Sequence, residues 1–134
     1  MDADDLKKRT KLFALRVLKL AAALPNTIEC KVIRGQLVRA GTSVGANYRA
    51  SCRARSRAEF IAKIGVVIEE SDESGYWLEL IMDGGFMSTV RVMPLLTEAV
   101  ELTKIMTQSR VTALARNMSK ERKANRQSKI FNQK

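Results

Sequence analysis

The sequence predicts an all-α fold, an antiparallel up-and-down bundle of four helices, and three observations lead to it. Hydrophobic residues make up 46% of the 134 residues but aromatic residues only 5%, so small and aliphatic side chains must build the core. In four long segments, apolar residues recur every three or four positions, the period of an α-helix. Helix-capping and helix-breaking residues separate these segments. A chain of this length is expected to form one domain with a core of ordinary size.

We expect the first helix over residues 6–24, where Phe13, Val17 and Leu24 fall on one face. Pro25 directly after it ends the helix, because the residue before a proline is disfavoured in the helical conformation. The turn that follows is short, so the next helix runs antiparallel to the first.

The second helix is expected over residues 27–54, opened by a capping box of Asn26 and Glu29. Its glycines Gly35, Gly41 and Gly45 would each cost about 1 kcal/mol relative to alanine inside a helix. Their presence therefore predicts close approach by a neighbouring helix.

Ser56 and Glu59 form a second capping box, which begins the third helix. This helix ends at Gly84 and Gly85, where a left-handed C-cap is sterically free, and Phe86 is expected to pack back over that end.

The fourth helix is expected over residues 94–118, with Pro94 in its first turn and a loop or single helical turn over residues 88–93. From residue 116 to the end there are seven basic residues and one acidic residue. A stretch so charged has few apolar groups to bury. We therefore expect the bundle to comprise residues 1–118 and residues 119–134 to be a disordered basic tail.

The chain carries 24 Lys and Arg, 14 Asp and Glu and no His, a formal net charge of +10. This charge favours polyanionic partners, nucleic acid above all, although it is also compatible with a role in solubility alone. The charge is segregated: residues 1–58 hold thirteen basic and four acidic residues, whereas residues 59–83 hold one and seven.

Uninterrupted apolar runs such as residues 20–24 are far shorter than the roughly 20 residues that span a bilayer. The acidic N-terminus, with Asp2 and Asp4, does not resemble a signal peptide. Cys30 and Cys52 are expected on one continuous helix, roughly 33 Å apart, too far to pair. We therefore expect a cytoplasmic bacterial protein with no membrane partner.

The third helix carries the acidic residues Glu69, Glu70, Asp72 and Glu73, whose spacing is compatible with a metal site. Di-iron bundles also use Glu-x-x-His pairs, and this chain has no His. We favour ion pairs with arginines of the second helix, Arg39 among them, over metal binding. No metal and no cofactor is expected.

No catalytic residue is expected either, because Ser43, Ser51 and Cys52 have no His in the chain to activate them as nucleophiles. The sequence therefore predicts a protein that is not an enzyme.

Arginine recurs at four-residue spacing around the corner between the second and third helices, a geometry that can grip successive phosphates. An ordinary solvated surface remains the alternative. Together with the basic tail, the candidate nucleic-acid contacts are Arg49, Arg53, Arg55, Arg57, Lys120, Arg122, Lys123 and Arg126.

Tyr76 and Trp77 interrupt the acidic stretch and can either stack on bases or pack in a subunit interface. For Trp77, which lies beside Leu78 and Leu80, we favour the interface.

Residues 36–60 read QLVRAGTSVGANYRASCRARSRAEF and residues 69–80 read EESDESGYWLEL. These motifs resemble the bacterial four-helix bundle protein family, which includes proteins encoded in intervening sequences of large-subunit ribosomal RNA. The family is similar to the accessory variability proteins of diversity-generating retroelements. Departures are the tail after Met118 and the serines Ser71 and Ser74 in the acidic run.

The resemblance implies a ring-shaped homopentamer with a basic surface. In the retroelement branch it also implies binding to structured RNA or RNA/DNA and to a reverse transcriptase. The expected function is therefore that of a non-enzymatic, oligomeric nucleic-acid-binding protein. The alternative is a structural homo-oligomeric scaffold whose charge is incidental.

Overall fold

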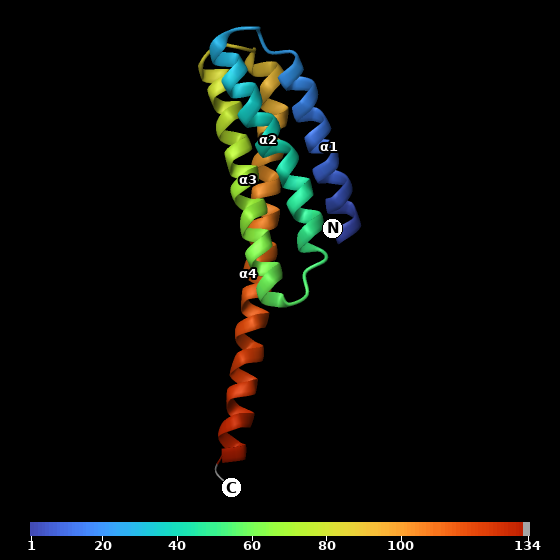
Figure 1. Cartoon of the computed structure of the whole chain (residues 1–134), viewed down its shortest axis with the longest axis vertical. Coiled ribbons are helices and arrows are strands. Elements are labelled where there is room, and N and C mark those ends of the chain that lie inside the picture. Colours follow the sequence, from blue (N-terminus) through green and yellow to red (C-terminus); the bar gives the residue numbers. More distant parts are fainter. Residues whose placement is uncertain (133–134) are drawn as a thin grey trace.

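The computed structural model describes residues 1–132 and holds, within them, four helices and no strand. The helices are α1 (Ala3–Ala22), α2 (Ile28–Ser51), α3 (Arg57–Asp83) and α4 (Thr89–Asn132). Successive helices pack side by side in alternating directions, and α4 also contacts α1 (Figure 1). The predicted all-α, four-helix fold is confirmed.

The core runs along the bundle axis and is built mainly from aliphatic side chains, with the rings of Phe13 and Tyr48 among them. Phe13 of α1, Leu37 of α2, Ile64 of α3 and Leu102 of α4 are all fully buried. Each lies on the apolar face of its helix, and burial of these faces supplies the main driving force for folding.

Local capping determines where the first two helices begin and end. Asp2 and Asp5 form a reciprocal capping box at the start of α1. The guanidinium of Arg34 donates to the carbonyl oxygens of Ala21 and Leu24, each at 3.0 Å, and so satisfies the C-terminal end of α1.

The predicted cap of α2 was wrong by one residue. Thr27, not Asn26, is the N-cap, and its hydroxyl accepts a hydrogen bond from the Cys30 amide at 3.2 Å. The two neighbours carry equivalent capping oxygens, so their chemistry alone does not decide between them. The helix ends at Ser51, before the predicted residue 54.

Close approach of α1 and α2 occurs at two of the three glycines of α2. A Cβ on Gly41 would lie 2.7 Å from a methyl carbon of Val17, and one on Gly45 would lie 3.2 Å from the Thr10 hydroxyl oxygen. Gly35 faces open space, with nothing within 4 Å, so the prediction was wrong there.

Both ends of α3 follow their local sequence signals. Ser56 is the N-cap and accepts from the Glu59 amide at 3.1 Å. At the other end, Gly85 has φ of 71°, and the amide of Phe86 donates to the carbonyl of Ile81 at 3.0 Å. This is the Schellman arrangement that a glycine with positive φ permits.

Helix α4 is longer than predicted at both ends. It begins at Thr89, so Pro94 lies inside the helix, near its start. It also continues to Asn132, where a disordered tail over residues 119–134 was expected; residues 133–134 lie outside the described part of the chain. Lys, Arg, Glu, Ala and Gln in this stretch are strong helix formers, and neither Gly nor Pro interrupts it.

We name residues 119–132 the extension, because this end of α4 projects beyond the other three helices (Figure 1). Every residue of the extension from 119 to 130 is exposed. Over the described residues, none of the helices is long and apolar enough to cross a membrane.

Candidate nucleic-acid interface

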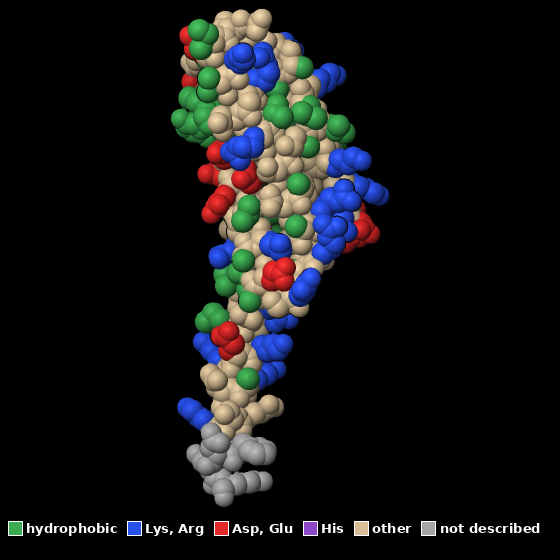
Figure 2. Space-filling view, viewed as in Figure 1, with side chains coloured by type: hydrophobic (Ala, Val, Ile, Leu, Met, Phe, Trp, Pro, Cys, Tyr) green, Lys and Arg blue, Asp and Glu red, His purple; other side chains and the backbone are tan. Residues whose placement is uncertain are grey.

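The fold brings three basic segments that are far apart in the sequence to one end of the bundle. Helix α1 begins at this end, α2 ends there, α3 begins there, and α4 passes through it into the extension (Figure 1). We name this surface the basic end; it comprises Lys7, Lys8, Lys11, Arg49, Arg53, Arg55, Arg57, Arg116 and Lys120. Figure 2 shows basic side chains gathered on its α1 side and along α4 below the bundle.

One part of the basic end is a groove between α1 and α2 with a volume of about 390 Å³. Lys7, Lys8 and Lys11 line it from α1, and Arg49 lines it from α2. The carboxylate of Asp4 lies 4.0 Å from the ammonium of Lys7, and solvent screens this pair because the Asp4 side chain is 85% exposed, so the ion pair is weak. The α1/α2 groove therefore keeps a strong positive charge.

A second groove, between α3 and α4, has a volume of about 510 Å³. Arg57 stands at the first residue of α3, and Arg116 and Lys120 face it from α4. Residue 57 was predicted as part of a corner cluster and residue 120 as part of a tail. The structure unites them in this α3/α4 groove and adds Arg116, which was not among the candidate contacts.

Arg53 and Arg55 lie in the connection from α2 to α3, and both are exposed. The four candidate arginines of the corner are therefore not one cluster. Arg49 lines the α1/α2 groove, Arg57 lines the α3/α4 groove, and the other two line neither.

The candidate contacts of the extension divide between two faces of α4. Lys120, one turn after Arg116, lines the α3/α4 groove with it. Arg122, Lys123 and Arg126 lie together around another hollow of α4, away from that groove.

Glu59 lies in the first turn of α3, at the basic end, where its carboxylate accepts a hydrogen bond from the Arg55 amide at 3.1 Å. The acidic residues over 69–73 of α3 lie away from the basic end and are partly engaged by Arg39 of α2. Its guanidinium lies 3.2 Å from a carboxylate oxygen of Glu70 and also contacts the carboxylate of Glu73. Glu69 and Asp72 are exposed. An inter-helix ion pair of the kind expected is therefore present at Arg39, where it links α2 to α3.

Trp77 is half-buried and packs against the bundle core. Its ring meets that of exposed Tyr76 edge to face, with centroids 5.1 Å apart. Its indole Nε1 is buried and has no hydrogen-bond partner among the described residues.

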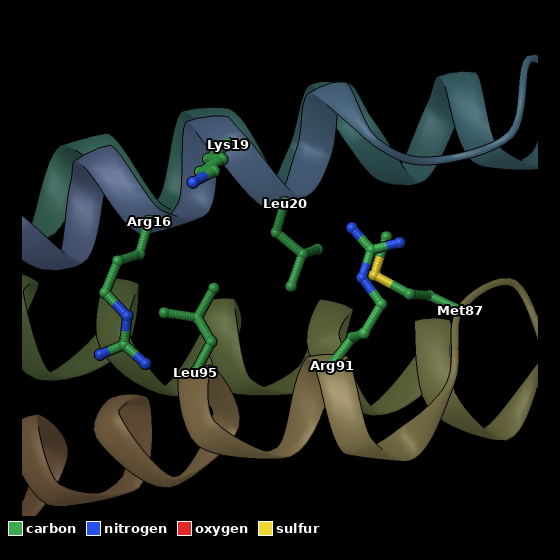
Figure 3. A pocket seen from close by; sticks show the side chains of 6 residues that line it. All are labelled: Arg16, Lys19, Leu20, Met87, Arg91 and Leu95. Atoms are coloured by element: carbon green, nitrogen blue, oxygen red, sulfur yellow. The ribbon is translucent and has the colours of Figure 1, made fainter.

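A third cluster of cations lies toward the opposite end of the bundle, where α1 ends and α4 begins. Arg16 and Lys19 of α1 and Arg91 of α4 line a cleft of about 210 Å³, with Leu20 and Leu95 between them (Figure 3). Positive charge is thus not confined to the basic end. This distant cleft supplies a natural control for experiments on charge.

Sequence reasoning missed the three lysines of α1 and Arg116. Lys7, Lys8 and Lys11 fall within one turn of a predicted helix, and that spacing was a usable signal. Their relation to Arg49 depends on which helices are neighbours, and only the fold supplies this.

Comparison with known proteins places residues 4–108 under the sequence profile of the 23S rRNA-intervening sequence proteins. A crystal structure of a protein with unknown function from the S23 ribosomal protein family of Bacteroides thetaiotaomicron superimposes with a TM-score of 0.74. The two chains are 32% identical, and the match covers 82% of this chain and 98% of the other. No curated protein matches this chain.

Proposed function

This chain belongs to the 23S rRNA-intervening sequence protein family, and from its basic end we propose that it binds structured RNA as a non-enzymatic homo-oligomer. The observation that carries the proposal is the meeting of three sequence-distant basic segments at the basic end, at residues 7–11, 49–57 and 116–120. Basic residues that served solubility alone would not need to be clustered, because an even distribution over the surface would serve equally well.

The arrangement favours contacts to the phosphate backbone without reading of base sequence. The two grooves and the extension present guanidinium and ammonium groups at several heights along the bundle axis. Such an array matches the closely spaced phosphates of folded RNA by charge and by shape. Side chains that read base edges in a groove are not needed for this mode of binding.

Self-association is supported by a line of exposed apolar residues on α4. Met93, Val100, Val111 and Met118 are each between 43% and 52% exposed. Their spacings of seven, eleven and seven residues place them on one face of the helix. A regular apolar stripe exposed on a helix is typical of a surface that another helix covers.

The family resemblance extends this proposal to a ring of five subunits. For the retroelement branch it also extends to RNA/DNA and a reverse transcriptase as partners. Mass measurement of the native protein in solution tests the ring, and a mass other than five subunits would contradict it. Co-purification with a reverse transcriptase encoded beside it tests the partner.

A structural scaffold without a role in nucleic-acid binding is the alternative function. Its supporting observation is the same apolar stripe, together with the ion pairs that Arg39 makes to Glu70 and Glu73. The two functions differ in their dependence on salt, because only phosphate binding releases counterions from RNA.

The test is fluorescence anisotropy of a labelled RNA hairpin over a series of salt concentrations. If the eight candidate contacts each neutralise one phosphate, the slope of log K against log salt is roughly −6 to −7. A slope near zero, or no binding at low salt, would support the scaffold instead.

A further inference from the structure

The α3/α4 groove carries positive charge without a lining carboxylate among the described residues. Arg57, Arg116 and Lys120 line it from two helices. The groove also lies at the first turn of α3, where the helix dipole is positive. Its most suitable ligand therefore contains an anionic group such as a phosphate.

The same groove holds an aromatic ring, which a phosphate alone does not need. Phe60, one turn into α3, is half-buried, and the accessible part of its ring lines the groove beside the three cations. All nucleobases stack on such a ring, whatever their identity. Charge and ring together are typical of sites for single-stranded nucleic acid.

The groove also offers neutral hydrogen-bonding groups and sufficient room. Gln108 and Thr112 line it from α4, and the Gln108 amide nitrogen lies 3.4 Å from the Thr112 hydroxyl oxygen. The volume of about 510 Å³ falls within the roughly 300 to 1,000 Å³ of small-molecule sites. A single nucleotide is a ligand of suitable size and polarity.

We propose that the α3/α4 groove takes one unpaired nucleotide of the bound RNA, with its base against Phe60 and its phosphate between Arg57, Arg116 and Lys120. This inference rests on the proposed RNA-binding function and adds a selectivity to it. A base inside a duplex is stacked on both faces and cannot reach a half-buried ring between two helices. The groove therefore favours RNA in which one base is turned out of the stack.

The test uses two hairpin RNAs of equal loop and stem that differ by one bulged nucleotide, here the fluorescent base 2-aminopurine. The full-length protein is expected to bind the bulged hairpin more tightly, by roughly five- to a hundredfold, the range of one base stacked on an aromatic ring. Binding should also change the fluorescence of the bulged base, because its stacking partner changes.

Phe60→Leu keeps an apolar side chain and removes the aromatic face. This variant, checked for an unchanged helical spectrum, should bind both hairpins equally. Because Phe60 also packs on the core, a second variant avoids the core altogether. Arg116→Gln with Lys120→Gln changes exposed residues only and should reduce the preference for the bulge.

The matched control is Arg122→Gln with Arg126→Gln, which removes the same charge from a different face of α4. It should weaken binding to both hairpins by the same factor and leave the preference intact. Equal affinity of the unaltered protein for both hairpins would overturn the inference while leaving RNA binding in place. Absence of binding to either hairpin would overturn the proposed function itself.

Discussion

The guanidinium of Arg9 on α1 donates a hydrogen bond to each carboxylate oxygen of Glu98 on α4. Its Nε lies 2.9 Å from Oε2 and its Nη2 lies 2.6 Å from Oε1. The hydrogen bond to Glu98 raises the pKa of Arg9 above its ordinary value. This bidentate pair links the first and last helices, whose mutual contact is the least extensive in the bundle.

The pair is expected to stabilise the closure of α1 onto α4. Both side chains are less than a third exposed, at 27% and 17%, so solvent screens them only partly. A double-mutant cycle with Arg9→Lys and Glu98→Gln, measured by urea unfolding, should give a coupling of about 1 to 3 kcal/mol. Lysine keeps the charge but not the two-pronged geometry. A coupling near zero would show that the geometry contributes nothing.

Gly41→Ala tests the close approach of α1 and α2. The new methyl group would meet Val17, which is fully buried and has a stiff, branched side chain. We expect a loss of about 1 to 3 kcal/mol in the free energy of unfolding, despite the higher helix propensity of alanine.

Gly35→Ala is the matched control on the same helix. It faces open space, so it should stabilise the protein by up to about 1 kcal/mol through helix propensity alone. Equal effects of the two substitutions would contradict the packing described for Gly41.

From the burial of the Tyr48 phenol we expect a loss of stability at alkaline pH. Burial raises the pKa of its phenol above the ordinary value of 10.0, because the charged phenolate is poorly solvated in the core. The folded protein then holds this proton more tightly than the unfolded chain does. The resulting stabilisation is complete below pH 10 and is lost as the pH rises toward the pKa of the folded state.

The measurement is urea unfolding of the parent and of Tyr48→Phe between pH 7 and pH 11. Phenylalanine cannot ionise, so the variant should gain on the parent above pH 10. A difference in stability that stays constant across the range would contradict the effect of burial on this phenol.

Local signals made several helix ends predictable from sequence. The cap at Ser56 and the left-handed residue at Gly85 depend on contacts within a few positions. The end of α4 was not predictable in the same way, because two local signals conflict there. The high charge of residues 119–132 indicates disorder, whereas their helix propensity indicates a helix.

Contacts between residues on different helices could not be predicted from local sequence signals. Arg9 and Glu98 are 89 positions apart in the sequence. Arg57 and Arg116 line the same groove only because α3 and α4 are neighbours at the basic end. Sequence spacing groups residues within one helix. Spacing does not say which other helix packs against that helix. For this reason Arg49 and Arg57 were predicted as one cluster, although they lie in different grooves.

The central claim, that the basic end binds RNA phosphates, is tested most directly by charge removal at the two ends of the bundle. One variant carries glutamine in place of the four arginines around the corner between α2 and α3, which are Arg49, Arg53, Arg55 and Arg57. The control removes four charges near the opposite end, at Arg16, Lys19, Lys31 and Arg91. For each folded variant, hairpin affinity is measured against salt concentration. The corner variant should flatten the log-log slope by about 0.7 to 0.9 for each lost phosphate contact, and the control should leave the slope unchanged. Equal slopes for the parent and the corner variant, or equal flattening in both variants, would contradict the claim.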